Sequence, residues 1–133
     1  MNKILMIFVC AMSCLPFASA QNDQSAPAVA PQQVVPADAK NHIGETVTVC
    51  GKVVDTKINK YGIGGRGKPV LFYIDKPEAT ADFYFLAFGT KEGGPDEAVA
   101  AYNGKSVCVT GKVAAASGQP YIAITDRSTI KVK

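Results

Sequence analysis

The chain of 133 residues contains no tryptophan, one histidine, His42, and two arginines, Arg66 and Arg127. A single histidine with no serine or cysteine arranged around it offers no basis for a catalytic triad. It also leaves too few ligands for a zinc site. The one pair of neighbouring carboxylates, Asp96 and Glu97, is explained by the electrostatics of a helix start. We therefore expect no enzyme, no metal ion and no cofactor.

Charge is also scarce, because only 19% of the residues are charged and the formal net charge is +3. This mild basicity neither requires nor excludes a polyanionic partner. Any electrostatic inference must therefore rest on where the charges lie along the chain.

Long apolar runs are absent except at the N-terminus, "MNKILMIFVCAMSCLPFASA". Lys3 precedes the apolar residues 4–15, and the small residues 18–20 form a cleavage site, as in a secretory signal peptide. A transmembrane anchor is the alternative, but the run falls short of the roughly 20 residues that a span needs and is broken by Pro16. We expect residues 1–20 to be a signal peptide, the mature protein to be periplasmic or secreted, and no stable membrane span to remain.

The four cysteines divide into two pairs by position. Cys10 and Cys14 lie in the signal peptide. Lipid attachment at Cys14 is an alternative that Ala11, three positions earlier, disfavours. Cys50 and Cys108 remain after cleavage, and one cysteine pair in an exported domain predicts one disulfide.

Residues 21–37, "QNDQSAPAVAPQQVVPA", are rich in Ala, Pro and Gln and lack periodicity, which predicts a flexible linker. Residues 38–133 form the expected domain. Alternating apolar residues and turn signals predict strands over 46–53, 70–75, 82–89, 105–113 and 121–125, a short terminal strand over 128–133, and a two-turn helix from Pro95 to Gly104. An all-β order with one short helix between the third and fourth strands is the layout of the five-stranded OB-fold Greek-key barrel.

Two of the predicted strands have nearly the same sequence, "IGETVTVCGKVV" and "NGKSVCVTGKVA". Two copies are too few for a repeat architecture. In an OB barrel the first and fourth strands lie antiparallel and both curve, so Gly51 and Gly111 are expected to permit a bend or a bulge.

The alternation in these strands also places the cysteines. With the flanking valines inward, Cys50 and Cys108 both point outward, and facing side chains on antiparallel strands come within disulfide reach. The bridge would contribute on the order of 4 kcal/mol in the chain-entropy model. A redox pair or two free buried thiols are the alternatives, and the absence of a C-x-x-C motif disfavours the redox pair.

The segments "HIGETVTVCGKV", "VLFYID", "DFYFLAFG" and "YNGKSVCVTGKV...GQPYIAITDRSTIKV" resemble the bacterial exported OB-fold proteins related to the anticodon-binding and other nucleic-acid-binding OB domains. The resemblance covers about residues 39–133. It implies the OB fold and, by fold analogy, nucleic-acid binding, and it supplies no catalytic residues. The nuclease family built on this barrel uses clustered acids and arginines, which two arginines do not provide.

The loop expected between the first two strands, "DTKINKYGIGGRGKPV", is the most basic stretch of the chain. It carries Lys57, Lys60, Arg66 and Lys68 against the single acid Asp55. OB domains bind oligomers beside this loop, so these four cations are our candidate phosphate contacts for single-stranded nucleic acid or another oligoanion. The alternative is an ordinary solvated loop.

Aromatic side chains on the strands would supply the stacking surface of such a site. We assign this role to Tyr73 and Tyr84, although the inward face of the strand over 82–89 is ambiguous and about half of the aromatics must be core. A second hypothesis is an envelope protein partner bound on an outward apolar patch of Leu71, Tyr73, Leu86 and Phe88. A third is an envelope protein that binds a small ligand.

Overall fold

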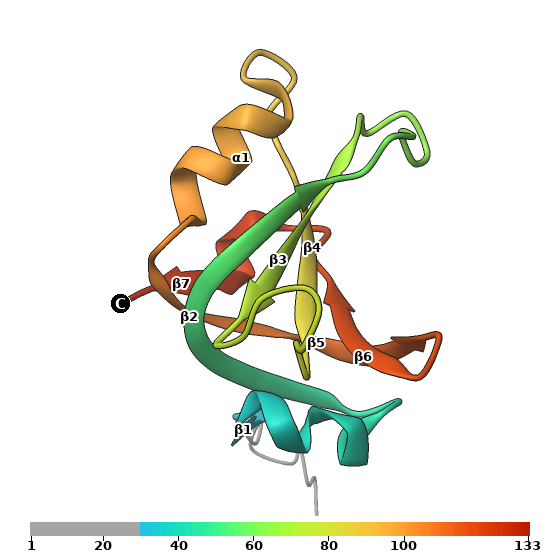
Figure 1. The fold of residues 1–133 in the computed structure, drawn as a ribbon, viewed down its shortest axis with the longest axis vertical. Helices are drawn as coiled ribbons and strands as arrows, with labels where there is room; N and C mark the ends of the chain where they lie inside the picture. The colour runs from blue at the N-terminus through green and yellow to red at the C-terminus, as the bar shows by residue number, and fades with distance from the viewer. Residues whose placement is uncertain (1–29) are drawn as a thin grey trace, which may run out of the picture.

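The structure is a computed structural model that describes residues 30–133, so the expected signal peptide lies outside the described residues. The chain is mostly β, with seven strands in one sheet and three short helices among the described residues (Figure 1). In order, the elements are β1 (Gln32–Val34), η1 (Pro36–His42), β2 (Thr46–Ile58), β3 (Pro69–Ile74), β4 (Tyr84–Phe88), α1 (Gly94–Tyr102), β5 (Ser106–Ala116), β6 (Gln119–Ala123), η2 (Arg127–Thr129) and β7 (Ile130–Val132). Within this part of the chain, none of the helices has the length and apolar character that crossing a membrane requires.

The long strand β2 closes the sheet into a ring because it pairs with two different strands. Its first half, residues 46–52, runs antiparallel to β5, and its second half, residues 53–58, runs antiparallel to β3. β3 pairs with β4, β4 runs parallel to β6, and β6 returns to β5. Figure 1 shows β2 curving around the molecule between these two sets of partners. Five strands therefore form a closed circuit, with β1 and β7 added outside it.

The interior of the ring is filled by alternate residues of the strands and by α1. Phe72 and Phe85 stack with ring centroids 4.8 Å apart, and Tyr102 of α1 meets Phe72 edge-on at 5.5 Å. Ala98 of α1 and Ala39 of η1 are also fully buried. The two helices lie at opposite ends of the sheet (Figure 1), so each covers one end of the core.

Arg127 of η2 fixes the position of α1. Its Nη1 donates to Glu97 at 2.7 Å, its Nε donates to the Tyr102 hydroxyl at 2.9 Å, and its guanidinium lies 5.1 Å from the centre of the Tyr102 ring. The hydrogen bond from Arg127 is the main cause that lowers the pKa of Glu97. The carboxylate that we assigned to helix-start electrostatics therefore also anchors the helix to the C-terminal segment.

The repeated glycines are required by close packing against neighbouring strands. A Cβ atom on Gly51 would lie 2.2 Å from Cγ2 of Ile74, and one on Gly111 would lie 2.6 Å from Cγ2 of Ile122. The irregularity in the β2–β3 register lies later, between Val53 and Asp55, so the expected bulge is not at Gly51. Each repeat thus keeps a glycine where an isoleucine of the adjacent strand packs onto its backbone.

The predicted disulfide is confirmed. Cys50 lies directly opposite Cys108 in the β2–β5 register, and their sulfur atoms are 2.07 Å apart. Thr48 and Thr110 face each other two positions away, with their hydroxyl oxygens 2.8 Å apart. The covalent link therefore lies on the seam where the ring closes.

The prediction of a flexible linker through residue 37 is wrong for its last residues. Gln32–Val34 form β1, which runs parallel to residues 47–49 of β2, and Val34 and Pro36 are buried. Three strand residues are too few to show periodicity in a segment rich in Pro and Gln. The ordered domain therefore begins before residue 38.

Removing the disulfide should destabilise the domain substantially. The bridge spans 58 residues of sequence. For a loop of that size the chain-entropy model predicts that Cys50→Ala/Cys108→Ala lowers the free energy of unfolding by about 4 kcal/mol. Urea denaturation monitored by circular dichroism measures this change. A reducing agent should destabilise the parent to the same extent and leave the double variant unchanged, and a loss below about 1 kcal/mol would contradict the structural role.

Adding a methyl group at either repeated glycine should also destabilise the core. Because Gly51→Ala and Gly111→Ala each force an isoleucine to move, we expect each to lower the free energy of unfolding by about 1–3 kcal/mol. Lys112→Ala, which truncates an exposed side chain next to Gly111, is the control and should change stability by less than about 0.5 kcal/mol. Equal stability of the glycine variants and the parent would show that these positions tolerate a side chain.

Candidate binding site

The outer face of β3 and β4 is set by the residues that enter the core. Val70, Phe72 and Ile74 of β3 belong to the core cluster, as do Phe83, Phe85 and Ala87 along the β4 segment. The inward face of the strand over 82–89 is therefore settled. Leu71, Tyr73, Tyr84 and Leu86 lie on the opposite face, and Leu71 pairs directly with Leu86 while Tyr73 pairs with Tyr84.

A cavity of about 420 Å³ lies over this outer face. The leucines and tyrosines that line it come from β3, β4 and β6 and are Leu71, Tyr73, Tyr84, Leu86 and Tyr121. Its remaining lining residues are Lys57, Asn59, Ile63, Pro69, Glu78 and Ala116. We call this cavity the tyrosine groove.

Three tyrosines form a continuous aromatic row in the groove. The rings of Tyr73 and Tyr84 are 5.6 Å apart and tilted by 46°, and those of Tyr84 and Tyr121 are 5.3 Å apart and stacked at 12°. Tyr73 is 3% exposed and Tyr84 is 8% exposed, whereas Tyr121 is half-buried. Tyr73 and Tyr84 are therefore buried and are not the open stacking surface that we expected, because Tyr84 packs against Tyr73 on one side and Tyr121 on the other.

Sequence reasoning missed Tyr121, which is the most exposed member of this row. The signal was present, because Tyr121 alternates with Ile122 and Ile124, both of which point into the core. The strand carries only one aromatic residue, and its parallel pairing with β4, which sets Tyr121 opposite Tyr84, follows from the tertiary fold.

Burial raises the pKa of two of these tyrosines. The pKa of Tyr73 rises to about 12, first through desolvation and then through the charges of Glu78, Tyr84 and Asp55. Desolvation also raises the pKa of Tyr84, with a further contribution from Tyr121. Both phenols are therefore neutral near pH 7.

The four predicted phosphate contacts do not form one cluster. Lys57 lines the tyrosine groove and makes an ion pair with Glu78, while Lys60 lies in the loop and lines none of the three cavities described here. Arg66 and Lys68 instead line a second cavity of about 290 Å³, together with Lys91. Residues that are close in sequence are separated in space, because the glycines of the loop let its backbone turn back on itself.

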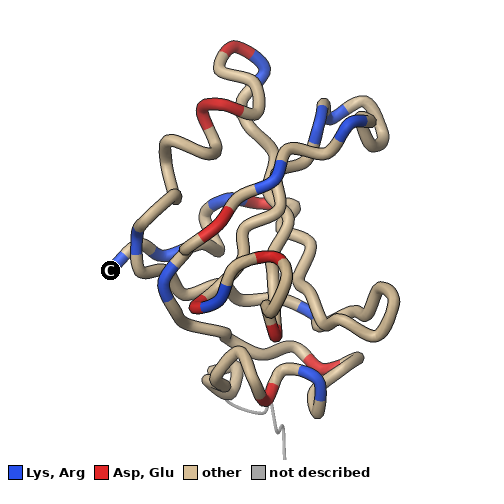
Figure 2. Tube along the Cα trace, in the orientation of Figure 1, with Lys and Arg blue, Asp and Glu red and all other residues tan. Residues whose placement is uncertain are grey.

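This second cavity, which we call the basic cavity, is lined by three cationic side chains and by no acid. Its walls are the loop over 65–68 and the segment from Gly89 to Pro95 that enters α1. The guanidinium of Arg66 lies 6.0 Å from the ring centre of Phe88, which positions it over β4. Figure 2 shows Lys and Arg without Asp or Glu along the loop between β2 and β3. Sequence reasoning missed Lys91 because it lies far from the loop in the chain.

The basic cavity lies just past the ends of the two strands that line the tyrosine groove. Pro69, the first residue of β3, lines the groove, and Lys68 before it lines the basic cavity. Leu86 of β4 lines the groove, and Gly89, which follows the last residue of β4, lines the basic cavity. At about 3.3 Å per strand residue, Leu86 and Gly89 are roughly 10 Å apart. A ligand of only a few units could therefore contact both.

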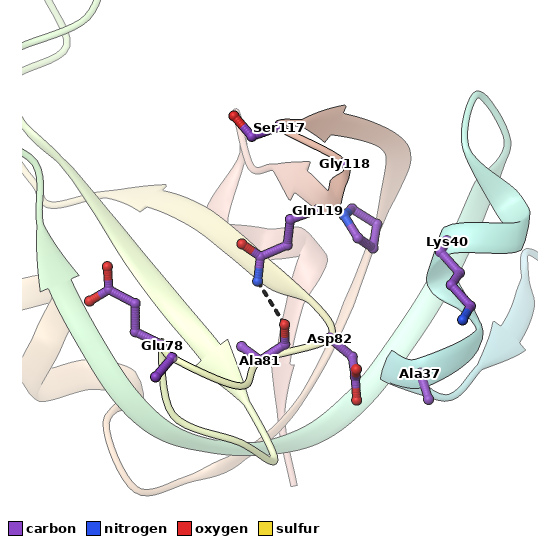
Figure 3. A pocket seen from close by; sticks show the side chains of 10 residues that line it. Ala37, Lys40, Glu78, Ala81, Asp82, Ser117, Gly118 and Gln119 are labelled. Atoms are coloured by element: carbon purple, nitrogen blue, oxygen red, sulfur yellow. Dashed lines mark hydrogen bonds between the residues drawn. The ribbon is translucent and has the colours of Figure 1, made fainter.

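Figure 3 shows a third cavity, of about 350 Å³. It is bounded by η1, the loop over 78–82 and the turn between β5 and β6. Its charged lining residues are Lys40, Glu78 and Asp82, and the Gln119 side chain donates to the Ala81 carbonyl at 2.8 Å. Glu78 is shared with the tyrosine groove, so the two cavities meet at this residue.

The described part of the chain, residues 30–133, contains no group of three His, Cys, Asp or Glu side chains that could hold a metal ion. The Nδ1 atom of His42 lies 2.6 Å from Glu45, and His42 lines none of the three cavities.

Comparison with solved structures gives weak structural likenesses. No known family model matches the chain, and no curated protein matches it. A crystal structure described as an aspartyl-tRNA synthetase from Leishmania major Friedlin matches 82% of this chain with a TM-score of 0.46 and 11% identity. The match spans 22% of that protein. The bacterial exported family expected from the sequence is not shown by these comparisons and stays a prediction.

The depth of Tyr73 in the groove predicts a specific loss of stability at high pH. An unfolded tyrosine ionises near pH 10, whereas folded Tyr73 has a pKa of about 12. Between these values the unfolded state loses its proton first, so stability falls as pH rises through this window. Tyr73→Phe removes this contribution, and its free energy of unfolding, measured by urea denaturation at a series of pH values, should fall less steeply than that of the parent.

Tyr61→Phe is the matched control, because Tyr61 is 77% exposed and lies outside the groove. It should keep the steep decline of the parent. Parallel declines in the parent and in Tyr73→Phe would contradict the burial of this phenol.

Proposed function

We propose that the chain is an OB-type binding module that holds a short single-stranded nucleic acid, or a similar oligoanion, across the outer face of β3, β4 and β6. The five-strand circuit of β2, β3, β4, β6 and β5 supports an OB-type barrel, since five strands with one helix between the third and fourth are typical of that fold. The observation that carries the proposed ligand is an aromatic groove on β3 and β4 with a basic cavity just past the ends of these two strands.

Each part of this surface suits one part of an oligonucleotide. Aromatic rings bind bases by stacking, and Tyr121 is the most exposed of the three groove tyrosines. The neutral phenols of Tyr73 and Tyr84 add no charge that would repel a phosphate. Cationic side chains release counterions from the phosphates, a role that suits Arg66, Lys68 and Lys91 in the basic cavity.

A second candidate function is an apolar contact with a protein segment or a small ligand. Leu71 and Leu86 face each other across β3 and β4 in the floor of the groove, which favours this alternative. Phe88, the remaining member of the predicted apolar patch, instead contacts Arg66. The salt dependence of the affinity distinguishes the two functions, because phosphate binding weakens steeply with ionic strength and an apolar contact does not.

We further propose that the protein is exported to the periplasm or secreted, and that it binds its ligand without transforming it. The proposal of export rests on the N-terminal sequence pattern and on a disulfide, which persists in oxidising compartments. An envelope protein partner remains part of the second candidate function.

Binding of a labelled oligothymidylate tests the proposal. A length of about ten nucleotides is within the site size of one OB domain. Fluorescence anisotropy at low and at physiological salt should show binding that weakens with salt. Arg66→Gln/Lys68→Gln should bind about tenfold more weakly at low salt, and its salt slope should be smaller by about 1.4, since each phosphate contact on a single strand contributes about 0.7.

The control is Lys105→Gln/Lys112→Gln, which removes the same charge from exposed positions outside the three cavities. It should bind within twofold of the parent. Absence of binding at low salt, or an equal loss in both double variants, would contradict the assigned site.

A further inference from the structure

Lys57 lies in the groove where it could contact a phosphate, but its ammonium group is already paired with a carboxylate. Among the described residues that line the tyrosine groove it is the one cation, and Glu78 is the one acid. The ammonium group of Lys57 donates directly to the carboxylate of Glu78. The charge that the groove could offer to an anionic ligand is therefore cancelled within the groove itself.

The backbone, and not the Glu78 side chain, holds this acid beside Lys57. The amide of Glu78 donates to Oδ2 of Asp55 at 3.1 Å, while Oδ1 of the same carboxylate accepts from the amide of Thr56 at 2.9 Å. Asp55 thus ties the loop that carries Glu78 to β2, two residues before Lys57. A change of the Glu78 side chain leaves this attachment in place.

Glu78 also marks the end of the groove that lies away from the basic cavity. Beyond it lies the third cavity, where Asp82 adds a second carboxylate and Lys40 a single cation (Figure 3). The surface thus changes from three cations at one end to an acidic residue at the other. An oligoanion that followed β3 past Tyr73 would meet Glu78, whose charge already acts on the Tyr73 hydroxyl.

We propose, in an inference that rests on the proposed function, that Glu78 is a specificity-determining residue that masks the charge of Lys57. Glu78 thereby confines the phosphates of an oligoanion to the end of the groove nearest the loop between β2 and β3. The side chains of Lys57 and Glu78 are 56% and 47% exposed, so solvent screens their attraction and the pair is easily exchanged. With the carboxylate removed, Lys57 becomes a phosphate contact and the like-charge repulsion disappears.

A double-mutant cycle on Lys57 and Glu78 tests this inference with the same oligothymidylate probe. Glu78→Gln keeps the shape of the side chain and should tighten binding about fivefold at low salt, the scale of an exposed ion pair. Its salt slope should become steeper by about 0.7, the value of one added phosphate contact on a single strand. Lys57→Gln alone should change affinity by less than twofold, whereas Lys57→Gln in the Glu78→Gln background should remove most of the gain and all of the added salt slope.

Asp82→Asn is the matched control, because it removes the same charge and also breaks one exposed lysine–carboxylate pair, that of Lys76 with Asp82. Asp82 lines the third cavity but not the tyrosine groove. This variant should leave the affinity within twofold of the parent and the salt slope unchanged.

The outcomes separate a failure of this inference from a failure of the proposed function. If the parent binds and Lys57→Gln has the same effect in both backgrounds, the masking of Lys57 is overturned and the binding site stands. Equal tightening in Glu78→Gln and Asp82→Asn also overturns it, because a general charge effect then explains the gain. If neither the parent nor Glu78→Gln binds, the proposed function is overturned and the role of Glu78 with it.

Discussion

The pairing of β2 with two different strands is the constraint on which the rest of the structure depends. Its first half is joined to β5 by seven register pairs and by the disulfide, and its second half turns away to pair with β3. This divergence closes the circuit and leaves one outer face on β3, β4 and β6. Gly51 and Gly111 also help to close the circuit. Each lacks a side chain where an isoleucine of a neighbouring strand packs against the backbone of β2 or β5.

The closed circuit also decides which charges can act together. Four cations that are close in sequence are separated by the path of the loop between β2 and β3, whereas Lys91 joins Arg66 and Lys68 from the segment that precedes α1. Lys57 is left in the tyrosine groove with Glu78, which reaches it from the far end of β3. A modest net charge of +3 can therefore support a local basic cavity beside a groove that is electrically balanced.

Local sequence patterns predict the strands and the core faces well, because they depend on alternation alone. Val47 and Val49 point inward and Cys50 and Cys108 meet as expected. Features that depend on distant partners were missed or misplaced. β1 is recognised only through its parallel pairing with β2, Tyr121 only through its stacking on Tyr84, and the burial of Tyr73 only through the rings that cover it. The same limit applies to Glu78, whose role depends on an ion pair across 21 positions.

The measurement that tests the central claim most directly is a map of the ligand on the folded domain. Backbone amide spectra of the labelled protein, recorded during titration with a short oligothymidylate at low salt, report which residues sense the ligand. The account predicts that the largest shifts fall on Leu71, Leu86 and Tyr121 and extend to the basic cavity around Lys68 and Lys91. Shifts concentrated on the seam of β2, β5 and β7, around Cys108 and its neighbour Lys131, would contradict it.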